Sequence, residues 1–161
     1  RRVAERSGWS SGAVRHYLPP REAMLDAAAA QVGAAIEQRV RAVPTDSTPR
    51  QALVGVLAAV LPDDERMRQA SRVWLAFVGQ SASDRDLAER QGIVYSDLNE
   101  LLVRLLDWAG TEGRAVAAGP VASATQLQAL VDGLTVHVLL DQVSVESARQ
   151  VLQNAVDAVL G

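Results

Sequence analysis

Several residue types are absent or rare in this chain of 161 residues, and each absence excludes a class of protein. There is no cysteine, which excludes a disulfide framework, thiolate metal ligands and a cysteine nucleophile. No apolar run approaches the roughly 20 residues that cross a bilayer, and no signal peptide is visible. Aromatic residues make up only 4% of the chain, and no segment alternates as a strand does. We therefore expect a soluble, cytoplasmic, helical protein with no membrane partner.

The residues that carry catalysis are also scarce. The two histidines, His16 and His137, lie far apart in the sequence. There is no Gly-rich phosphate loop, no His/Asp cluster with metal-ligand spacing and no nucleophile motif. The acidic run Asp63–Glu65 is typical of a helix start in solvent. The sequence therefore predicts no catalytic residue, metal or cofactor. An all-α enzyme would need carboxylates that only the fold could bring together.

Positive charge is concentrated at the N-terminal end. Residues 1–21 hold five arginines against one glutamate, a net charge of +4, which leaves −7 for residues 22–161 because the whole chain carries −3. A basic end on an acidic body favours contact with a polyanion such as nucleic acid. The alternative is a solvated terminus in which the arginines have no partner.

The rest of the sequence predicts a series of capped helices. Residues 48–51 have the form of a capping box with Pro49 at the first helical position. Residues 123–126 are a second capping-box candidate, and Ser144 is a typical N-cap. We expect helices at about 20–43, 48–61, 63–81, 83–110, 123–140 and 144–160. The predicted fold is all-α, with a small N-terminal helix-turn-helix followed by a larger helical body.

The first 25 residues contain the most specific signal. Two short helical stretches meet at Gly8, and Ser10 can cap the second. In a helix-turn-helix the second helix enters the major groove. Arg15 can fork onto a guanine, and His16 can reach a base or a phosphate. We predict DNA contacts from Ser10, Ser11, Gly12, Ala13, Arg15, His16, Tyr17 and Arg21.

These residues also match a known pattern. Its elements are Val3–Ala4, the turn Gly8–Ser10, the helix Gly12–Arg15, the pair Tyr17–Leu18, and Pro20–Glu22 followed by Leu25. The pattern resembles the DNA-binding signature of TetR-type transcriptional regulators. Ala13 and Arg15 stand where the family usually has Thr and Tyr, which removes two usual hydroxyl contacts to DNA and changes the operator that we expect.

The remainder resembles the BetI-like subgroup of this family in residues 74–77, in the long helix that ends near 110–113, and in residues 131–134. The resemblance implies a homodimer on operator DNA, with a small-molecule inducer in the helical body of each subunit. It also implies that the first helix of the DNA-binding domain lies upstream of Arg1. The expected domains are 1–26 for DNA binding and 27–161 for ligand binding and dimerisation.

The two C-terminal helices support a dimer on separate grounds. Residues 127–140 are apolar nearly all round, and such a helix must be buried on both sides. Two such helices from each copy can form a four-helix interface, or they can simply fill the core of one chain. We predict interface contacts from Leu127, Leu130, Leu134, Val138, Val151, Leu152, Ala155, Val156 and Val159.

The few aromatic residues gather in the central helices, where they can line a ligand cavity or form ordinary core. We predict a ligand site at Trp74, Phe77, Tyr95 and Asn99. An apolar or aromatic inducer is expected, although Asp132 leaves room for a cation. The lone His137 is expected to be a core or interface histidine.

Together these features predict a ligand-responsive, dimeric DNA-binding transcriptional regulator, a repressor that a small-molecule inducer releases from its operator. The alternative is a helical small-molecule-binding protein whose terminal motif does not bind DNA.

Overall fold

A computed structural model describes the chain from Arg21 to Gly161, with side chains from Ala30 onward except those of Arg90 and Val94. The regular structure of this part is entirely helical, which confirms the all-α fold predicted from the sequence. The helices are α3 (Arg21–Val40), α4 (Pro49–Val60), α5 (Glu65–Ser81), α6 (Arg85–Thr111), α7 (Pro120–Leu139) and α8 (Val145–Leu160).

The helix starts follow the local sequence closely. The Thr48 hydroxyl accepts a hydrogen bond from the Gln51 backbone N at 3.3 Å, and the Gln51 side chain accepts one from the Thr48 backbone N at 2.8 Å. This confirms the capping box predicted for α4, with Pro49 in its first turn. Side-chain oxygens also cap the starts of α5, α6 and α8, at Asp64, Asp84 and Ser144.

The capping box predicted at residues 123–126 is wrong. Helix α7 begins three residues earlier, at Pro120, after Gly119 with φ 77°. Glycine adopts this left-handed backbone without strain, and proline fits the first helical turn, so this pair starts the helix. Ser123 is therefore inside the helix, where its side chain is fully buried.

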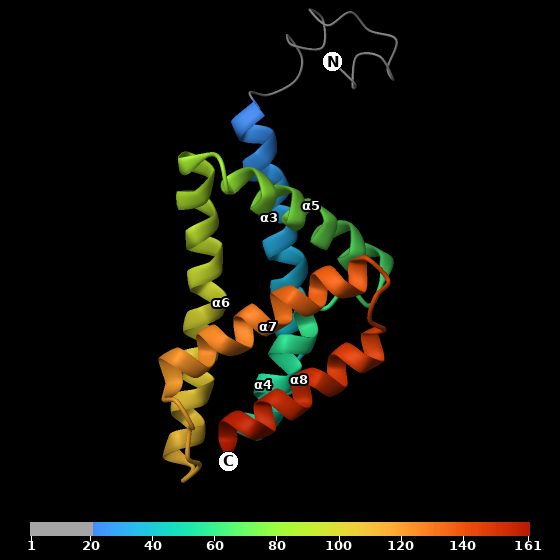
Figure 1. Cartoon of the computed structure of the whole chain (residues 1–161). Helices are drawn as coiled ribbons and strands as arrows, with labels where there is room; N and C mark the ends of the chain where they lie inside the picture. The colour runs from blue at the N-terminus through green and yellow to red at the C-terminus, as the bar shows by residue number, and fades with distance from the viewer. Residues whose placement is uncertain (1–20) are drawn as a thin grey trace, which may run out of the picture.

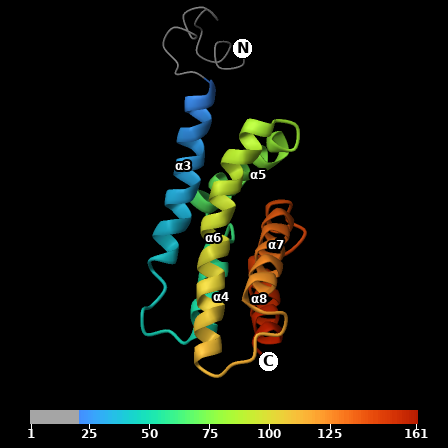
Figure 2. The same ribbon diagram turned by 90° about the vertical axis from the view of Figure 1, so that its left-hand side faces the viewer.

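The helices form a body from which α3 projects (Figures 1 and 2). Helix α6 packs on α7, α4 packs on α8, and α3 packs on α5 and α4. Helices α7 and α8 pack together on the side of the body opposite α3 (Figure 2). The N-terminal end of α3 points away from the body, whereas its C-terminal end lies beside α4.

The main core lies where α4, α6, α7 and α8 meet. Its fully buried side chains include Leu53, Leu57, Leu102, Leu106, Leu127 and Leu152. Helix α4 carries several of these leucines and contacts three other helices of this core, so it forms the centre of the body. Within the described residues, no helix is long and apolar enough to span a bilayer.

Candidate ligand pocket and subunit surface

A pocket of about 440 Å³ lies between α3, α5, α6 and α7. Each helix contributes residues about one turn apart, so one face of each helix lines the pocket. The apolar part of the wall comprises Val32, Ile36 and Val40 from α3, Met67 from α5, and Leu98 and Leu101 from α6. We call this cavity the central pocket. Its concave, mainly apolar wall with a few polar groups is typical of a small-molecule site.

The predicted ligand residues divide into two groups. Trp74 and Tyr95 line the central pocket. Phe77 is buried but lies outside the lining. Asn99 also lies outside the lining, and its amide donates a hydrogen bond to the Gln128 side-chain oxygen at 2.9 Å. The role of these residues in ligand binding stays a prediction.

Gln128 holds two walls of the central pocket together. Its side-chain nitrogen donates to the Tyr95 carbonyl oxygen at 3.1 Å, while its oxygen accepts from Asn99. Both ends of this buried amide are therefore satisfied within the protein. Gln128 and Asn99 therefore position α6 against α7, with one N–H and the oxygen of the Gln128 amide each bonded within the protein.

Asp132 is the polar centre of the pocket. Burial raises the pKa of its carboxyl to about 6, and a hydrogen bond with Tyr95 partly offsets this rise. Burial also raises the pKa of the Tyr95 hydroxyl, the negative charge of Asp132 raises it further, and a hydrogen bond with Trp74 lowers it. Trp74, Tyr95 and Asp132 thus form one polar chain across three helices. The Asp132 carboxyl is mainly ionised at pH 7 although it is poorly solvated.

Among the described side chains that line the central pocket there is no arginine or histidine, so Asp132 has no basic partner among them. Two more acidic residues, Glu37 from α3 and Asp97 from α6, line the pocket and are exposed. The sequence analysis did not predict either of them, because acidic residues are common on the solvated faces of helices.

Thr135 also lines the pocket, one turn beyond Asp132 on α7. Thr135 is only 2% exposed, and its hydroxyl has no hydrogen-bond partner among the described residues. A buried polar atom without a partner is uncommon and needs a physical explanation. Nothing in the sequence distinguishes Thr135 from an ordinary core threonine.

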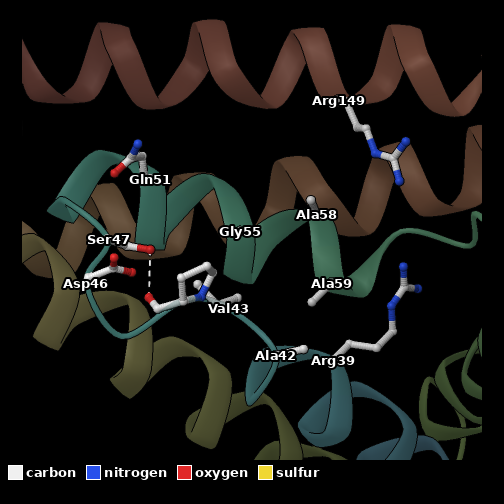
Figure 3. Close-up of a pocket in the computed structure, with 11 residues that line it drawn as sticks. Arg39, Ala42, Val43, Asp46, Ser47, Gln51, Gly55, Ala58, Ala59 and Arg149 are labelled. Atoms are coloured by element: carbon white, nitrogen blue, oxygen red, sulfur yellow. Dashed lines mark hydrogen bonds between the residues drawn. The ribbon is translucent and has the colours of Figure 1, made fainter.

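A second hollow, of about 550 Å³, lies between the α3–α4 connection, α4 and α8 (Figure 3). Arg39 and Arg149 stand at one end, and Asp46, Ser47 and Gln51 stand at the other. Its floor consists of small residues, and no aromatic side chain lines it.

The two arginines of this hollow are bound to Asp63, and we call the three residues the Asp63 cluster. Arg39 donates to one carboxylate oxygen of Asp63 at 2.5 Å and to the Leu61 carbonyl at 3.1 Å. Arg149 donates to the other oxygen of Asp63. The cluster therefore fixes the C-terminal end of α3 to the start of α5 and to α8.

Gly55 on α4 holds the same end of α3 close to the body. A Cβ atom at this position would meet the two Val43 methyl groups at 3.0 and 3.1 Å. A larger side chain would have to displace Val43, so glycine favours the close approach of the α3–α4 connection to α4.

The predicted DNA contacts from Ser10 to Tyr17 lie outside the described residues, and the side chain of Arg21 does too. They stay predictions. The expected domain boundary between residues 26 and 27 falls inside the continuous helix α3 and also stays a prediction.

The predicted interface residues lie mainly in the core of the single chain. Six of the nine are buried there and present almost no surface to a partner: Leu127, Leu134, Val138, Leu152, Val156 and Val159. They fill the monomer core, which was the alternative explanation of their pattern. Leu130 and Ala155 are partly buried, and Val151 is 40% exposed.

The exposed side of α7 nevertheless carries large apolar residues and no charged residue. Val121 is 67% exposed and Leu140 is 60% exposed, and both lie at the ends of α7. The sole charged residue within α7 is Asp132, which lines the central pocket instead. We call the exposed residues Val121, Ala129, Gly133, Leu140 and Val151 the outer face. His137 is exposed on α7, so it is not a core histidine.

The helical body matches solved structures of transcriptional regulators. A regulator from Rhodococcus sp. Rha1 superposes with a TM-score of 0.80 at 25% identity, covering 99% of this chain and 83% of that one. A regulator from Saccharomonospora viridis, solved in complex with choline, gives a TM-score of 0.81 at 23% identity over 96% of this chain and 82% of that one. The fold is that of a helical transcriptional regulator.

Sequence comparison identifies the family. Residues 49–161 match the C-terminal domain of BetI-type transcriptional repressors. The regulator PksA of Bacillus subtilis is 29% identical over 92% of this chain and 72% of its own length. The regulator BetI of Paraburkholderia phytofirmans is 30% identical over 98% of this chain and 80% of its own length. The chain belongs to the TetR family of transcriptional regulators, with a BetI-type C-terminal domain, which confirms the resemblance found in the sequence.

Proposed function

We propose that this regulator is a dimeric repressor whose N-terminal segment binds operator DNA and whose central pocket takes a small cation that releases it. The observation that carries the proposal is Asp132, a poorly solvated carboxylate in a pocket whose described lining side chains include no basic one. A buried charge without a counter-ion is costly, and a cationic ligand removes that cost.

Two aromatic side chains beside Asp132 favour the same ligand class. Trp74 and Tyr95 line the pocket, and the Tyr95 hydroxyl interacts with the Asp132 carboxyl, which raises the pKa of that hydroxyl. Aromatic faces attract ammonium groups, and the interaction contributes about 2 kcal/mol of binding free energy when the site is desolvated. The Saccharomonospora viridis regulator with the same fold was solved with choline, a quaternary ammonium ion. These observations support a cation over the neutral apolar inducer that the aromatic residues alone suggested.

Helix α3 provides a route from the ligand to DNA. Val32, Ile36 and Val40 line the pocket, and the same helix continues towards the N-terminal segment. The Asp63 cluster fixes its C-terminal end, so a ligand that displaces α3 moves mainly the opposite end. Differential binding to two positions of α3 gives a coupling of about 1–3 kcal/mol, a 5–150-fold change in operator affinity.

The outer face supports a twofold dimer through α7 and α8. The other exposed side chains of α7 are uncharged polar ones such as Thr125, Gln126 and His137, and a charge-poor surface of this kind is typical of an interface core. Two copies packed in this way would form a four-helix contact and place two DNA-binding segments on successive major grooves, about 34–36 Å apart.

The experiment that tests this function measures DNA binding and ligand response together. The full chain is titrated against DNA flanking its own gene, with and without choline, in wild type and in Asp132→Asn. We expect specific binding that choline weakens in wild type and not in the variant. Asp107→Asn is the matched control, because Asp107 is an exposed acid on α6 outside the pocket.

Two results would contradict the proposal. Absence of any specific DNA complex, with choline still bound, would favour the small-molecule-binding protein without DNA-binding activity. Equal choline responses in wild type and Asp132→Asn would remove Asp132 from the ligand site.

A further inference from the structure

We infer that the ligand of the central pocket is a linear diammonium ion, with one ammonium group between Asp132 and Thr135 and the other between Glu37 and Asp97 at the mouth. The inference rests on the proposed function, because it specifies the cation that the same pocket takes. Three observations carry it: a buried hydroxyl without a partner among the described residues, two further carboxylates in the lining, and a mainly apolar wall.

The hydroxyl of Thr135 indicates a ligand with an N–H donor. It is buried, lines the pocket and has no partner among the described residues. Thr135 lies one helical turn from Asp132 on α7, which places the two side chains on the same face of the helix. A primary ammonium group has three N–H donors and can bond to the carboxylate and to the hydroxyl together. A trimethylammonium group has no N–H and leaves the hydroxyl unsatisfied.

The mouth of the pocket indicates a second positive charge. Glu37 comes from α3 and Asp97 from α6, and both are exposed lining residues, unlike the buried Thr135. Glu37 accepts a hydrogen bond from Arg41 at 2.6 Å, four residues away on the surface. Exposed pairs of this kind are weak, so a ligand ammonium can replace Arg41 with little loss.

The rest of the pocket wall is mainly apolar, with Ser71, Gln91 and Gln128 among its polar members. Ile36, Leu98 and Leu101 line the pocket together with the carboxylates. Carboxylates at two places in a mainly apolar pocket match an alkyl chain with an ammonium group at each end. A monocation leaves the mouth carboxylates without a ligand charge, and a dication with a polar middle would bury polar atoms against leucine.

The test is calorimetric titration of the full chain at pH 7.5 with α,ω-diaminoalkanes of three to eight carbons. The n-alkylamine of equal length and choline are the comparison ligands. We expect the best diamine to bind about tenfold more tightly than its matched monoamine, since each exposed carboxylate contributes up to about fivefold.

Variants assign the two ends separately. Glu37→Gln and Asp97→Asn should bring the ratio of diamine to monoamine affinity towards one, whereas Glu100→Gln, an exposed acid on α6 outside the lining, should leave the ratio unchanged. Thr135→Val should weaken both amines relative to choline. It should also raise the melting temperature of the ligand-free protein, because it removes an unsatisfied buried hydroxyl.

The outcomes separate this inference from the proposed function. A diamine that binds no better than its monoamine, or a ratio unaffected by the Glu37 and Asp97 variants, overturns the diammonium ligand while choline binding through Asp132 still supports a cation pocket. If choline and every amine fail to bind, both fail together.

Discussion

Replacing Asp132 with asparagine should stabilise the ligand-free protein at neutral pH while it weakens cation binding. Burial raises the pKa of the Asp132 carboxyl from its ordinary 3.8 to about 6. A group whose pKa is raised by folding favours the folded state below pH 3.8, and this contribution is lost as pH rises towards 6. Above pH 6 the folded protein carries the full cost of the buried charge.

The size of this cost follows from the shift. Each pKa unit corresponds to about 1.4 kcal/mol, so a shift of about two units gives about 3 kcal/mol in a fully desolvated site. Asp132 is only partly buried, and solvent screening reduces the expected cost to about 1–2 kcal/mol. Asparagine keeps an oxygen that can accept from the Tyr95 hydroxyl, so the variant loses the charge and retains this partner.

The assay is urea unfolding of wild type, Asp132→Asn and the control Asp107→Asn between pH 4 and pH 8. We expect the free energy of unfolding of Asp132→Asn to exceed that of wild type by an amount that grows from pH 4 to pH 6 and is constant above. In parallel, the affinity of wild type for choline should fall as pH drops through about 6. A stability difference that does not change with pH, or a variant less stable than wild type at pH 7.5, would refute the reasoning.

Three further predictions concern the body of the protein. Val151→Glu should give folded monomers in sedimentation, because Val151 lies on the outer face. Val156→Glu should instead unfold the chain, because it buries an unpaired charge in the core. Equal effects of the two substitutions on folding would contradict this distinction. Leu57→Ala should lower the free energy of unfolding by about 2–5 kcal/mol in urea titration, and a loss below 1 kcal/mol would show that the site collapses around the cavity. Asp63→Ala leaves Arg39 and Arg149 without their carboxylate partner. It should lower the thermal stability of the protein and the effect of the ligand on DNA affinity. An unchanged ligand effect would show that the Asp63 cluster takes no part in the coupling between ligand and DNA binding.

Local sequence determines the helix boundaries to a large extent. The capping box at Thr48, the N-cap at Ser144 and the end of α6 near Gly110 were all predicted, since each depends on neighbours only a few residues away. The start of α7 was missed because Ser123 has cap-forming composition, while the left-handed backbone at Gly119 decides where the helix begins.

The pocket and the surfaces depend on how helices cross, which a sequence without its structure does not specify. Trp74 and Phe77 lie three residues apart on α5, yet Trp74 lines the pocket and Phe77 packs away from it. Helix α7 is apolar on more than one side, and the stripe with the larger side chains, Leu127 and Leu134, faces the core. The small residues Ala129 and Gly133 lie on the outer face. Because small side chains contribute little to a hydrophobic pattern, the sequence analysis did not predict them.

The most direct test of the central claim is the operator affinity of the full chain, measured by fluorescence anisotropy with and without a saturating cation, with cation binding verified in the same sample by calorimetry. The account predicts that the bound cation weakens operator binding 5–150-fold. An operator affinity that is the same with the cation bound and with the central pocket empty would contradict it.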